Sequence, residues 1–175
     1  HGQRLRLPNL VDDVSYQHAI SKRKDTYELR LKYGIPAKKR VFFCPARLLK
    51  LKGLDLFLKS AGKVKGISKA CFLLAGEGPM KKELQDIADK ENLDVHFMGY
   101  CNQDTVIEFY ALSDFFFLPS LQDCNPLSAI EAAFAGLPLC VSIYTGNSPE
   151  LIQPYKNGVV FDILDTEEVQ ACIYF

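Results

Sequence analysis

Short apolar runs alternate with amphipathic segments from about residue 40 to the end of the 175-residue chain. The runs lack regular alternation of apolar and polar positions, which is typical of parallel strands covered on both faces. They predict strands at 41–45, 71–75, 94–98, 115–118, 138–142 and 158–161. The segments between them predict helices at 53–65, 79–91, 103–112, 126–135, 148–153 and from 166 onward. We therefore expect the α/β class, with an open parallel sheet of about six strands and helices on both faces.

The first 36 residues follow a different pattern. "SKRKDTYELRLKYG" predicts a polar helix that ends at Gly34, and "RLPNLVDD" before it is turn-like. We divide the chain into a leading segment, 1–36, and one domain, 37–175. Because the chain starts without Met and stops in "EEVQACIYF", partway through a predicted helix, we expect it to be a fragment of a longer protein.

Composition narrows the class of protein. The 21 basic and 21 acidic side chains balance, so the net charge does not indicate a nucleic-acid partner. No apolar run approaches the roughly 20 residues of a membrane helix. The six cysteines stand 16 to 32 residues apart without a C-x-x-C motif, which favours free thiols in a reducing cytosol. The three histidines are distant from the cysteines in sequence, so we predict no metal site and a cytoplasmic location.

The loop after the first strand carries two cations. In open parallel sheets, ligands bind at the carboxyl ends of the strands. "CPARLLKLKGLD" places Arg47 and Lys52 in such a loop, which Gly53 closes at a helix start. Two cations beside a helix N-terminus suit a diphosphate, although two solvated basic side chains would give the same pattern.

The loop after the second strand, "LLAGEGPMKKEL", contains part of a dinucleotide fingerprint. Gly76 and Gly78 give G-x-G, but Lys81 stands at the third glycine position. This pattern predicts a tight strand-to-helix turn that lets a ligand or a backbone approach, and it supports NAD only weakly.

The loop after the fourth strand leads into a helix. Asn125 is a good N-cap and Pro126 a good first helical residue, so we expect a helix from Pro126 that ends at Gly136.

An acidic residue stands on this helix without a local cation. Leu127, Ile130 and Phe134 share an apolar arc, and Glu131 lies at its edge. Glu131 must therefore pair with a distant cation, point to solvent or bind a ligand. Asp123, before the helix, reads on its own as a turn or capping acid.

Several segments together resemble a known family. "ARLLKLKGLD", "LLAGEGPMKKEL", "VHFMGY", "FFFLPSLQDCNPLSAIEAAFAGLP" and "GNSPELIQPYKNGVVFDILDTEEV" are similar, in order and spacing, to the carboxyl-terminal domain of family-four glycosyltransferases. These are retaining enzymes of the GT-B architecture, and the resemblance runs from about Leu7 to Val169. It implies a Rossmann-like donor-binding half of a two-domain enzyme, with 1–36 as interdomain crossover segment and leading helix.

The resemblance implies roles for the charged residues. Arg47 and Lys52 match the basic pair that grips the donor pyrophosphate. Asp123 and Glu131 match the ends of the E-x7-E signature, the first associated with hydroxyls of the transferred sugar and the second with the ribose hydroxyls. Arg47, Lys52 and Asp123 are the implied catalytic residues.

Two further positions are matched through their backbone. Gly99 matches a glycine near the nucleobase, and Leu127 a residue whose N–H faces the phosphate. The chain departs from the pattern where Asp123 replaces the usual Glu and where Asn125 and Pro126 replace Phe-Gly. These departures put the donor preference in doubt.

The resemblance implies transfer of a sugar from a UDP-, GDP- or ADP-sugar to an acceptor hydroxyl, with retention. No cofactor or metal is expected, and the sequence contains no Asp-x-Asp triplet. The implied partner is an amino-terminal acceptor domain, through which peripheral membrane association would occur, and the isolated chain would bind donor without turnover. A non-catalytic nucleotide-binding module and a GT-B-like nucleotide-sugar epimerase stay open as alternatives, with an NAD oxidoreductase a distant third.

Overall fold

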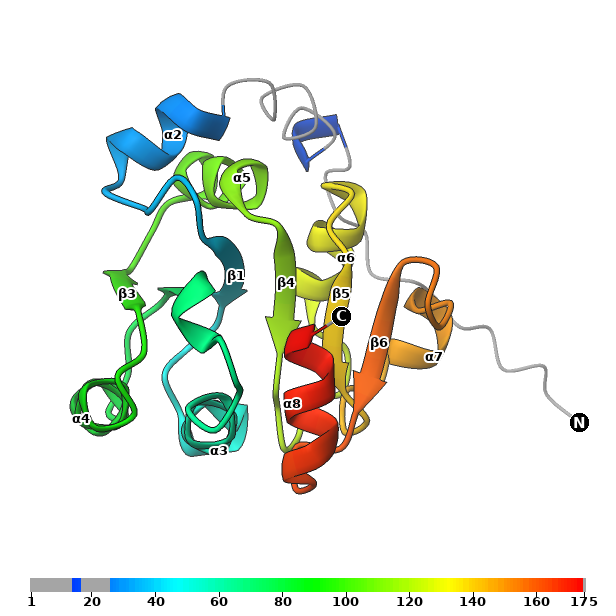
Figure 1. The fold of residues 1–175 in the computed structure, drawn as a ribbon. Helices are drawn as coiled ribbons and strands as arrows, with labels where there is room; N and C mark the ends of the chain where they lie inside the picture. The colour runs from blue at the N-terminus through cyan, green and yellow to red at the C-terminus, as the bar shows by residue number, and fades with distance from the viewer. Residues whose placement is uncertain (1–13, 17–25, 175) are drawn as a thin grey trace, which may run out of the picture.

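A computed structural model of the protein describes residues 14–16 and 26–174. Its centre is a six-stranded sheet in which every pairing is parallel (Figure 1). The strand order is β3-β2-β1-β4-β5-β6. The strands are β1 (Arg40–Pro45), β2 (Ala70–Ala75), β3 (Val95–Gly99), β4 (Phe115–Leu118), β5 (Leu139–Ser142) and β6 (Gly158–Phe161). The predicted fold class is confirmed.

Helices connect the strands in the expected order. They are α2 (Thr26–Lys32), α3 (Leu54–Ala61), α4 (Lys81–Lys90), α5 (Gln103–Leu112), α6 (Leu127–Phe134), α7 (Ser148–Leu151) and α8 (Thr166–Tyr174). The helix predicted at 53–65 is shorter, because Gly62 ends it and a turn with Gly66 in the left-handed region follows. The helix predicted to end at Gly34 ends at Lys32, and its predicted first residues, 21–25, lie outside the described residues.

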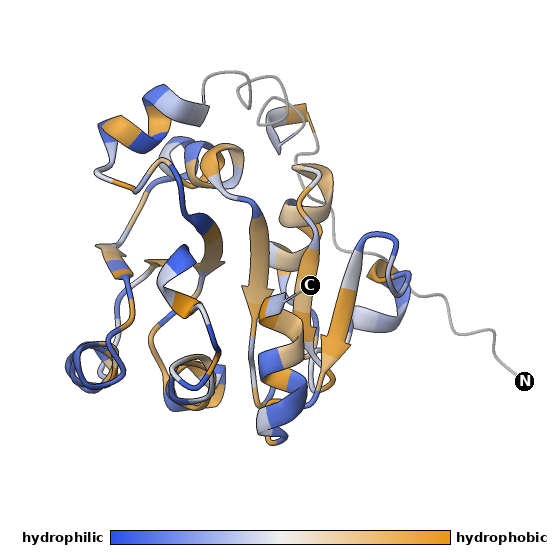
Figure 2. Ribbon diagram, in the orientation of Figure 1, coloured by the Kyte–Doolittle hydropathy of each residue, from blue (hydrophilic) through white to orange (hydrophobic). Residues whose placement is uncertain are grey.

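Aromatic side chains fill the core on both faces of the sheet. Phe57 of α3 packs against Phe72 and Phe117, with ring centroids 5.8 and 4.6 Å away. On the opposite face, Phe43 packs against Phe109 and Tyr110 of α5. Neighbouring strand residues point to opposite faces, so strands buried on both sides are apolar throughout, as their colour shows in Figure 2.

The strand order reverses direction at β1 and β4. The chain moves outward from β1 to β2 and β3, then returns to place β4 on the other side of β1. Ligands of open α/β sheets bind beyond the carboxyl ends of the strands at such a reversal, so we expect a site between the loops that follow β1 and β4. We call the region between these two loops the crevice.

A buried arginine fixes α2 to the amino-terminal edge of the sheet. The Arg30 guanidinium donates hydrogen bonds to the carbonyls of Leu112, Ala37 and Lys39, and it pairs with the carboxylate of Asp114 at 2.8 Å. The predicted boundary after residue 36 stays a prediction. Among the described helices, none is long and apolar enough to cross a membrane.

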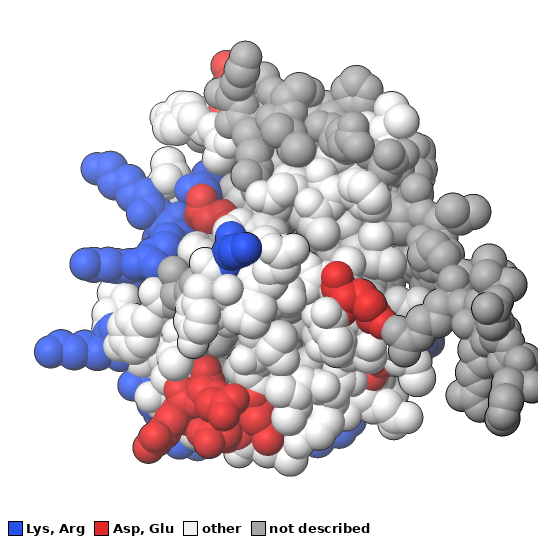
Figure 3. Space-filling view, turned by 90° about the vertical axis from the view of Figure 1, so that its right-hand side faces the viewer, with Lys and Arg blue, Asp and Glu red and all other residues white. Residues whose placement is uncertain are grey.

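Charged side chains are unevenly distributed over the surface. Seen from the β6 side, Lys and Arg project along one flank, and acidic side chains gather at the bottom (Figure 3). The sequence around the start of α8 at this level is acidic, with Asp162, Asp165, Glu167 and Glu168.

Candidate functional site

The loop after β1 is held between its two neighbours. On one side, the Ala46 and Leu48 N–H groups donate to the carbonyls of Ala75 and Glu77. On the other side, Leu121 N–H donates to the Leu51 carbonyl at 2.8 Å. These bonds continue the sheet pairing beyond the strand ends, so they give the loop a defined position over the crevice.

Glycines make these close approaches feasible. A Cβ on Gly76 would lie 2.1 Å from the Ala46 carbonyl oxygen, and one on Gly78 would lie 2.3 Å from that of Leu48. The incomplete G-x-G motif is thus explained by the approach of the neighbouring backbone. It supports the prediction of a tight turn and does not require a dinucleotide.

Gly53 plays the same part toward β4. It adopts φ 64°, in the left-handed region, where it ends a short 3-10 turn (Lys50–Lys52) and caps α3. A Cβ there would lie 2.1 Å from the Pro119 carbonyl oxygen. Gly53, which directly follows Lys52, therefore packs against the loop after β4.

Lys52 and Asp123 meet across the crevice. The Lys52 ammonium donates to Asp123 Oδ2, and both side chains are only 16% exposed. The structure therefore joins two predicted site residues from loops that are 71 residues apart in sequence. Within the described part of the chain, Asp123 Oδ1 has no hydrogen-bond partner, so it can accept a bond from a ligand.

Arg47 stands five residues before Lys52 and is exposed. Its guanidinium makes no ion pair among the described residues. Nearby, burial raises the pKa of the Cys44 thiol to about 12, which the charge of Lys52 opposes only in part. The buried Cys44 thiol therefore stays protonated in the free chain.

The predicted start of the helix after β4 is wrong by one residue. Pro126 is extended, with ψ 122°, and is the cap, while α6 begins at Leu127. The side chain of Asn125 does not cap the helix, because its Oδ1 accepts a hydrogen bond from Asn147 Nδ2 at 3.0 Å. Leu127 thus contributes the first helical N–H, which has no partner within the helix.

The predicted apolar arc of α6 does not face the core. Ala129 and Ala132 are buried, whereas Leu127 and Phe134 are 47% and 38% exposed. Small alanines let the helix lie close to β4 and β5, so the large apolar side chains of the arc point away from the sheet. Glu131 is half-buried, between these two surfaces.

Tyr110 of α5 is the partner of Glu131. Its hydroxyl lies 3.0 Å from Glu131 Oε2 and 3.1 Å from the Ser128 carbonyl. Burial, and then the charge of Glu131, raise the pKa of Tyr110 well above its usual value, so the hydroxyl stays protonated and donates. The partner is thus a buried hydroxyl, neither the distant cation nor the solvent weighed from sequence.

Gly99 lies at the end of β3, near the β2 loop. It has φ 70°, and its carbonyl accepts the Gly76 N–H at 2.7 Å. Glu77 covers it, since a Cβ on Gly99 would lie 2.9 Å from Glu77 Oε1. No contact among the described residues joins Gly99 to Lys52 or Asp123.

No role was predicted from sequence for the loop after β5, although the family resemblance includes this loop from Gly146 onward. Asp123 N–H donates to the Tyr144 carbonyl, and the Gly146 N–H donates back to the Asp123 carbonyl at 2.8 Å. Asn147 reaches the Pro126 carbonyl, and in the described chain neither its own Oδ1 nor Thr145 Oγ1 has a partner despite burial. This loop also follows a strand, so the rule that singled out the other loops could have found it.

The arrangement can hold a diphosphate. Arg47, Lys52 and the free N–H groups of α6 offer positive groups at one edge of the sheet, and Asp123 and Glu131 each keep an oxygen for a hydroxyl. Metal-ligand side chains lie elsewhere: among the described residues, Cys71, Asp94 and His96 come together at the opposite edge.

Known proteins share this sequence pattern. A family model described as "Glycosyl transferases group 1" matches residues 25–173. The N-acetyl-alpha-D-glucosaminyl L-malate synthase of Bacillus anthracis is 26% identical over 161 residues, covering 92% of this chain and 41% of that protein. The GDP-mannose-dependent alpha-(1-6)-phosphatidylinositol monomannoside mannosyltransferase of Mycobacterium tuberculosis is 27% identical over 156 residues, covering 83% and 40%. The chain therefore spans less than half the length of these curated relatives.

Solved structures share the fold. Anabaena Alr3699/HepE in complex with UDP-glucose matches with a TM-score of 0.75 at 20% identity, covering 95% of this chain and 45% of that one. At 20% identity this similarity shows a shared fold: the present chain has the architecture of one half of the longer Anabaena protein.

Proposed function

Because the chain belongs to the glycosyl transferases group 1 family, we propose that it is the donor-binding domain of a retaining glycosyltransferase. The full enzyme moves a sugar from a nucleotide diphosphosugar to an acceptor hydroxyl. The family and the relatives named above are transferases, so the comparisons do not favour a non-catalytic module or an epimerase.

The main support for the proposal is the ion pair between Lys52 and Asp123. The loop that holds Lys52 also contains the exposed Arg47. Breaking the bond between sugar and diphosphate builds negative charge on the departing nucleoside diphosphate. Arg47, Lys52 and the N-terminus of α6 stabilise this charge without a metal. In the free chain Asp123 pairs with Lys52. The ammonium has three donor hydrogens, so it can keep this pair and also donate to the arriving diphosphate.

The carboxylates bind hydroxyls in this account. Asp123 binds a hydroxyl of the transferred sugar through Oδ1 while Oδ2 keeps Lys52 in place. Glu131 binds the ribose through Oε1, because Oε2 is occupied by Tyr110. Gly99 lies by the nucleobase, and Leu127 N–H faces the phosphate.

The other half of the site belongs to the rest of the enzyme. The acceptor binds in an amino-terminal domain, and the crevice becomes a cleft between the two. The full enzyme works in the cytoplasm, with peripheral membrane association through that domain. The donor is a UDP-, GDP- or ADP-sugar, needs no cofactor, and is not turned over by this chain alone.

Calorimetric titration of the chain with UDP-, GDP- and ADP-sugars tests the proposal. We expect one nucleotide class to bind, and Arg47→Ala or Lys52→Ala to weaken binding about tenfold or more, since charge-assisted hydrogen bonds contribute about 1.5–3 kcal/mol each. An assay with the same donor and simple acceptors should show no transfer.

The chain offers matched controls at the opposite end of the sheet. Arg40→Ala and Lys69→Ala remove the same charges at the amino-terminal edge, where β1 and β2 begin, and should leave affinity unchanged. Absence of binding by every donor at millimolar concentration would contradict the proposal, as would a larger loss in the controls than in the site variants.

A further inference from the structure

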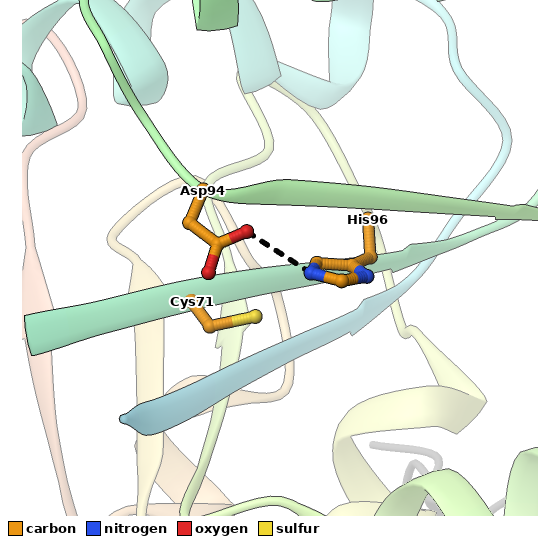
Figure 4. Close-up of side chains that lie close together, drawn as sticks. All are labelled: Cys71, Asp94 and His96. Carbon is orange, nitrogen blue, oxygen red and sulfur yellow. Dashed lines mark hydrogen bonds and ion pairs between the residues drawn. The ribbon is translucent and has the colours of Figure 1, made fainter. Parts of the chain in front are cut away.

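A second cluster of reactive side chains lies at the edge of the sheet opposite the crevice. Cys71 is the second residue of β2, Asp94 immediately precedes β3, and His96 is the second residue of β3. One ligand atom from each lies within 4.8 Å of the other two. Figure 4 shows the thiol, carboxylate and imidazole converging from the two strands. The proposed function uses none of these groups.

The distances suit a small tetrahedral ion. Zinc bonds of about 2.0–2.3 Å to nitrogen, oxygen and sulfur place the ligand atoms roughly 3.3–3.8 Å apart. His96 Nε2 and Asp94 Oδ1 are already 3.0 Å apart. Ligand atoms that are up to 4.8 Å apart must approach by up to about 1 Å to reach the spacing of a zinc site.

The scaffold around the cluster orients its groups. Asp94 Oδ2 accepts from Lys39 Nζ at 2.8 Å, which leaves Oδ1 facing the histidine. The Phe72 N–H donates to the Asp94 carbonyl at 2.8 Å, and His96 pairs in register with Leu73. Partners that hold a ligand's second atom are typical of metal sites, because they fix the direction of its lone pairs.

The cluster is also accessible from one side. Cys71 is fully buried, but the side chains of Asp94 and His96 are 24% and 25% exposed. Solvent can therefore deliver an ion and supply water as a fourth ligand, while the thiol closes the inner side.

We propose that Cys71, Asp94 and His96 bind one Zn²⁺ ion that joins the edge strand β3 to β2. Binding replaces the thiol proton by the metal: a sulfur–zinc bond forms, the proton leaves to solvent, and no electron is transferred. Because β3 is an edge strand with neighbours on one side only, this link stabilises the part of the sheet that ends at Gly99.

Cobalt titration of the metal-free 175-residue chain tests this site, because Co²⁺ takes tetrahedral zinc sites and gives a thiolate-to-cobalt absorption band. We expect one equivalent to produce the band and Zn²⁺ to displace it. Cys71→Ser, which keeps the volume of the side chain, should abolish the band. His96→Gln should weaken binding at least tenfold.

The controls separate this site from other thiols and histidines. Cys101→Ser changes a half-buried cysteine outside the cluster and should leave the titration unchanged. A His1→Ala/His18→Ala variant removes the remaining histidines and should also bind normally. One equivalent of Zn²⁺ should raise the unfolding temperature of the wild type but not of His96→Gln. Absence of the band in the wild type, its survival in Cys71→Ser, or its loss in either control would overturn the proposal.

Discussion

At the scale of single residues, partners decide what each carboxylate can do. Glu131 is half-buried at the edge of the exposed apolar arc of α6, and the hydroxyl of Tyr110 donates to its Oε2, which leaves Oε1 for a ligand. The side chain of Asp123 is one methylene shorter than the glutamate that is usual in the family. It nevertheless reaches Lys52 in the loop after β1, and this pairing fixes its position. The two acids are thus fixed by different neighbours, and their roles can be tested separately.

If Glu131 binds the ribose as proposed, its substitution should weaken binding only of ligands that carry the ribose hydroxyls. Wild-type chain should bind the preferred nucleoside diphosphate about tenfold more tightly than its 2′,3′-dideoxy analogue, because a carboxylate–hydroxyl bond contributes about 1.5 kcal/mol or more. Glu131→Gln should remove most of this ratio, and Tyr110→Phe should reduce it by freeing the carboxylate. Isothermal titration of both ligands measures the ratio.

Glu83→Gln, an exposed acid on α4, is the matched control and should keep the wild-type ratio. If Glu131→Gln weakens both ligands equally, or neither, Glu131 does not contact the ribose.

Sequence could name the charged residues but not their partners. Arg47 and Lys52 were singled out because two cations beside a helix start suit a diphosphate, and the family resemblance then favoured this role over two solvated side chains. The bond from Tyr110 to Glu131 spans 21 positions and depends on how α5 and α6 settle on the sheet, which no local pattern encodes. Asn147 and Thr145 carry no charge, and only their burial beside Asp123 makes them conspicuous.

At the scale of elements, runs of apolar residues identified the strands because burial on both faces leaves no polar positions. The same reasoning misjudged α6. Its buried side consists of alanines, so the largest apolar residues did not mark the inner face. The close packing of the loops could not be predicted in detail either, because the sequence does not show which backbone segment approaches a given glycine.

Gly53 offers a test of loop packing at this scale. Gly53→Ala would add a Cβ to a left-handed residue and place it against Pro119, whereas Gly34, with φ 67°, has nothing within 4 Å of its Cβ position. We expect Gly34→Ala to lower the free energy of unfolding by about 1–2 kcal/mol through backbone strain alone. Gly53→Ala should cost about 1–3 kcal/mol more through overpacking.

Urea unfolding of both variants measures these costs, and donor titration shows whether the loop has moved. Gly53→Ala should also weaken donor binding, because Lys52 moves with the loop, while Gly34→Ala should not. Equal losses of stability in the two variants would mean that the contact between Gly53 and the β4 loop is unimportant.

At the scale of the whole molecule, the strand order places the site. The reversal between β1 and β4 brings Lys52 and Asp123 together. The same order places the proposed zinc site, formed by Cys71, Asp94 and His96, where β2 and β3 begin. The alternation of strands and helices predicted an open parallel sheet, but it did not predict the order of the strands. The order of the strands needed the structure, because parallel strands pair across long stretches of chain.

The amino-terminal edge offers the main competing site for an anion. A pocket there is lined by Arg40, Lys65 and Lys69, next to Tyr174 of α8. Three cations could attract a nucleotide by charge alone, but nothing in this pocket offers the carboxylate oxygens that recognise hydroxyls. A donor that is recognised through its hydroxyls should therefore bind in the crevice, whereas one attracted by charge alone could bind in the pocket at the amino-terminal edge.

Amide chemical shifts of the isotope-labelled chain, followed during titration with the preferred nucleoside diphosphate, test the central claim most directly. The account predicts that the largest changes fall at 46–53, 121–128 and 144–148, around the crevice between β1 and β4. Changes centred instead on Arg40, Lys65 and Lys69 would contradict it.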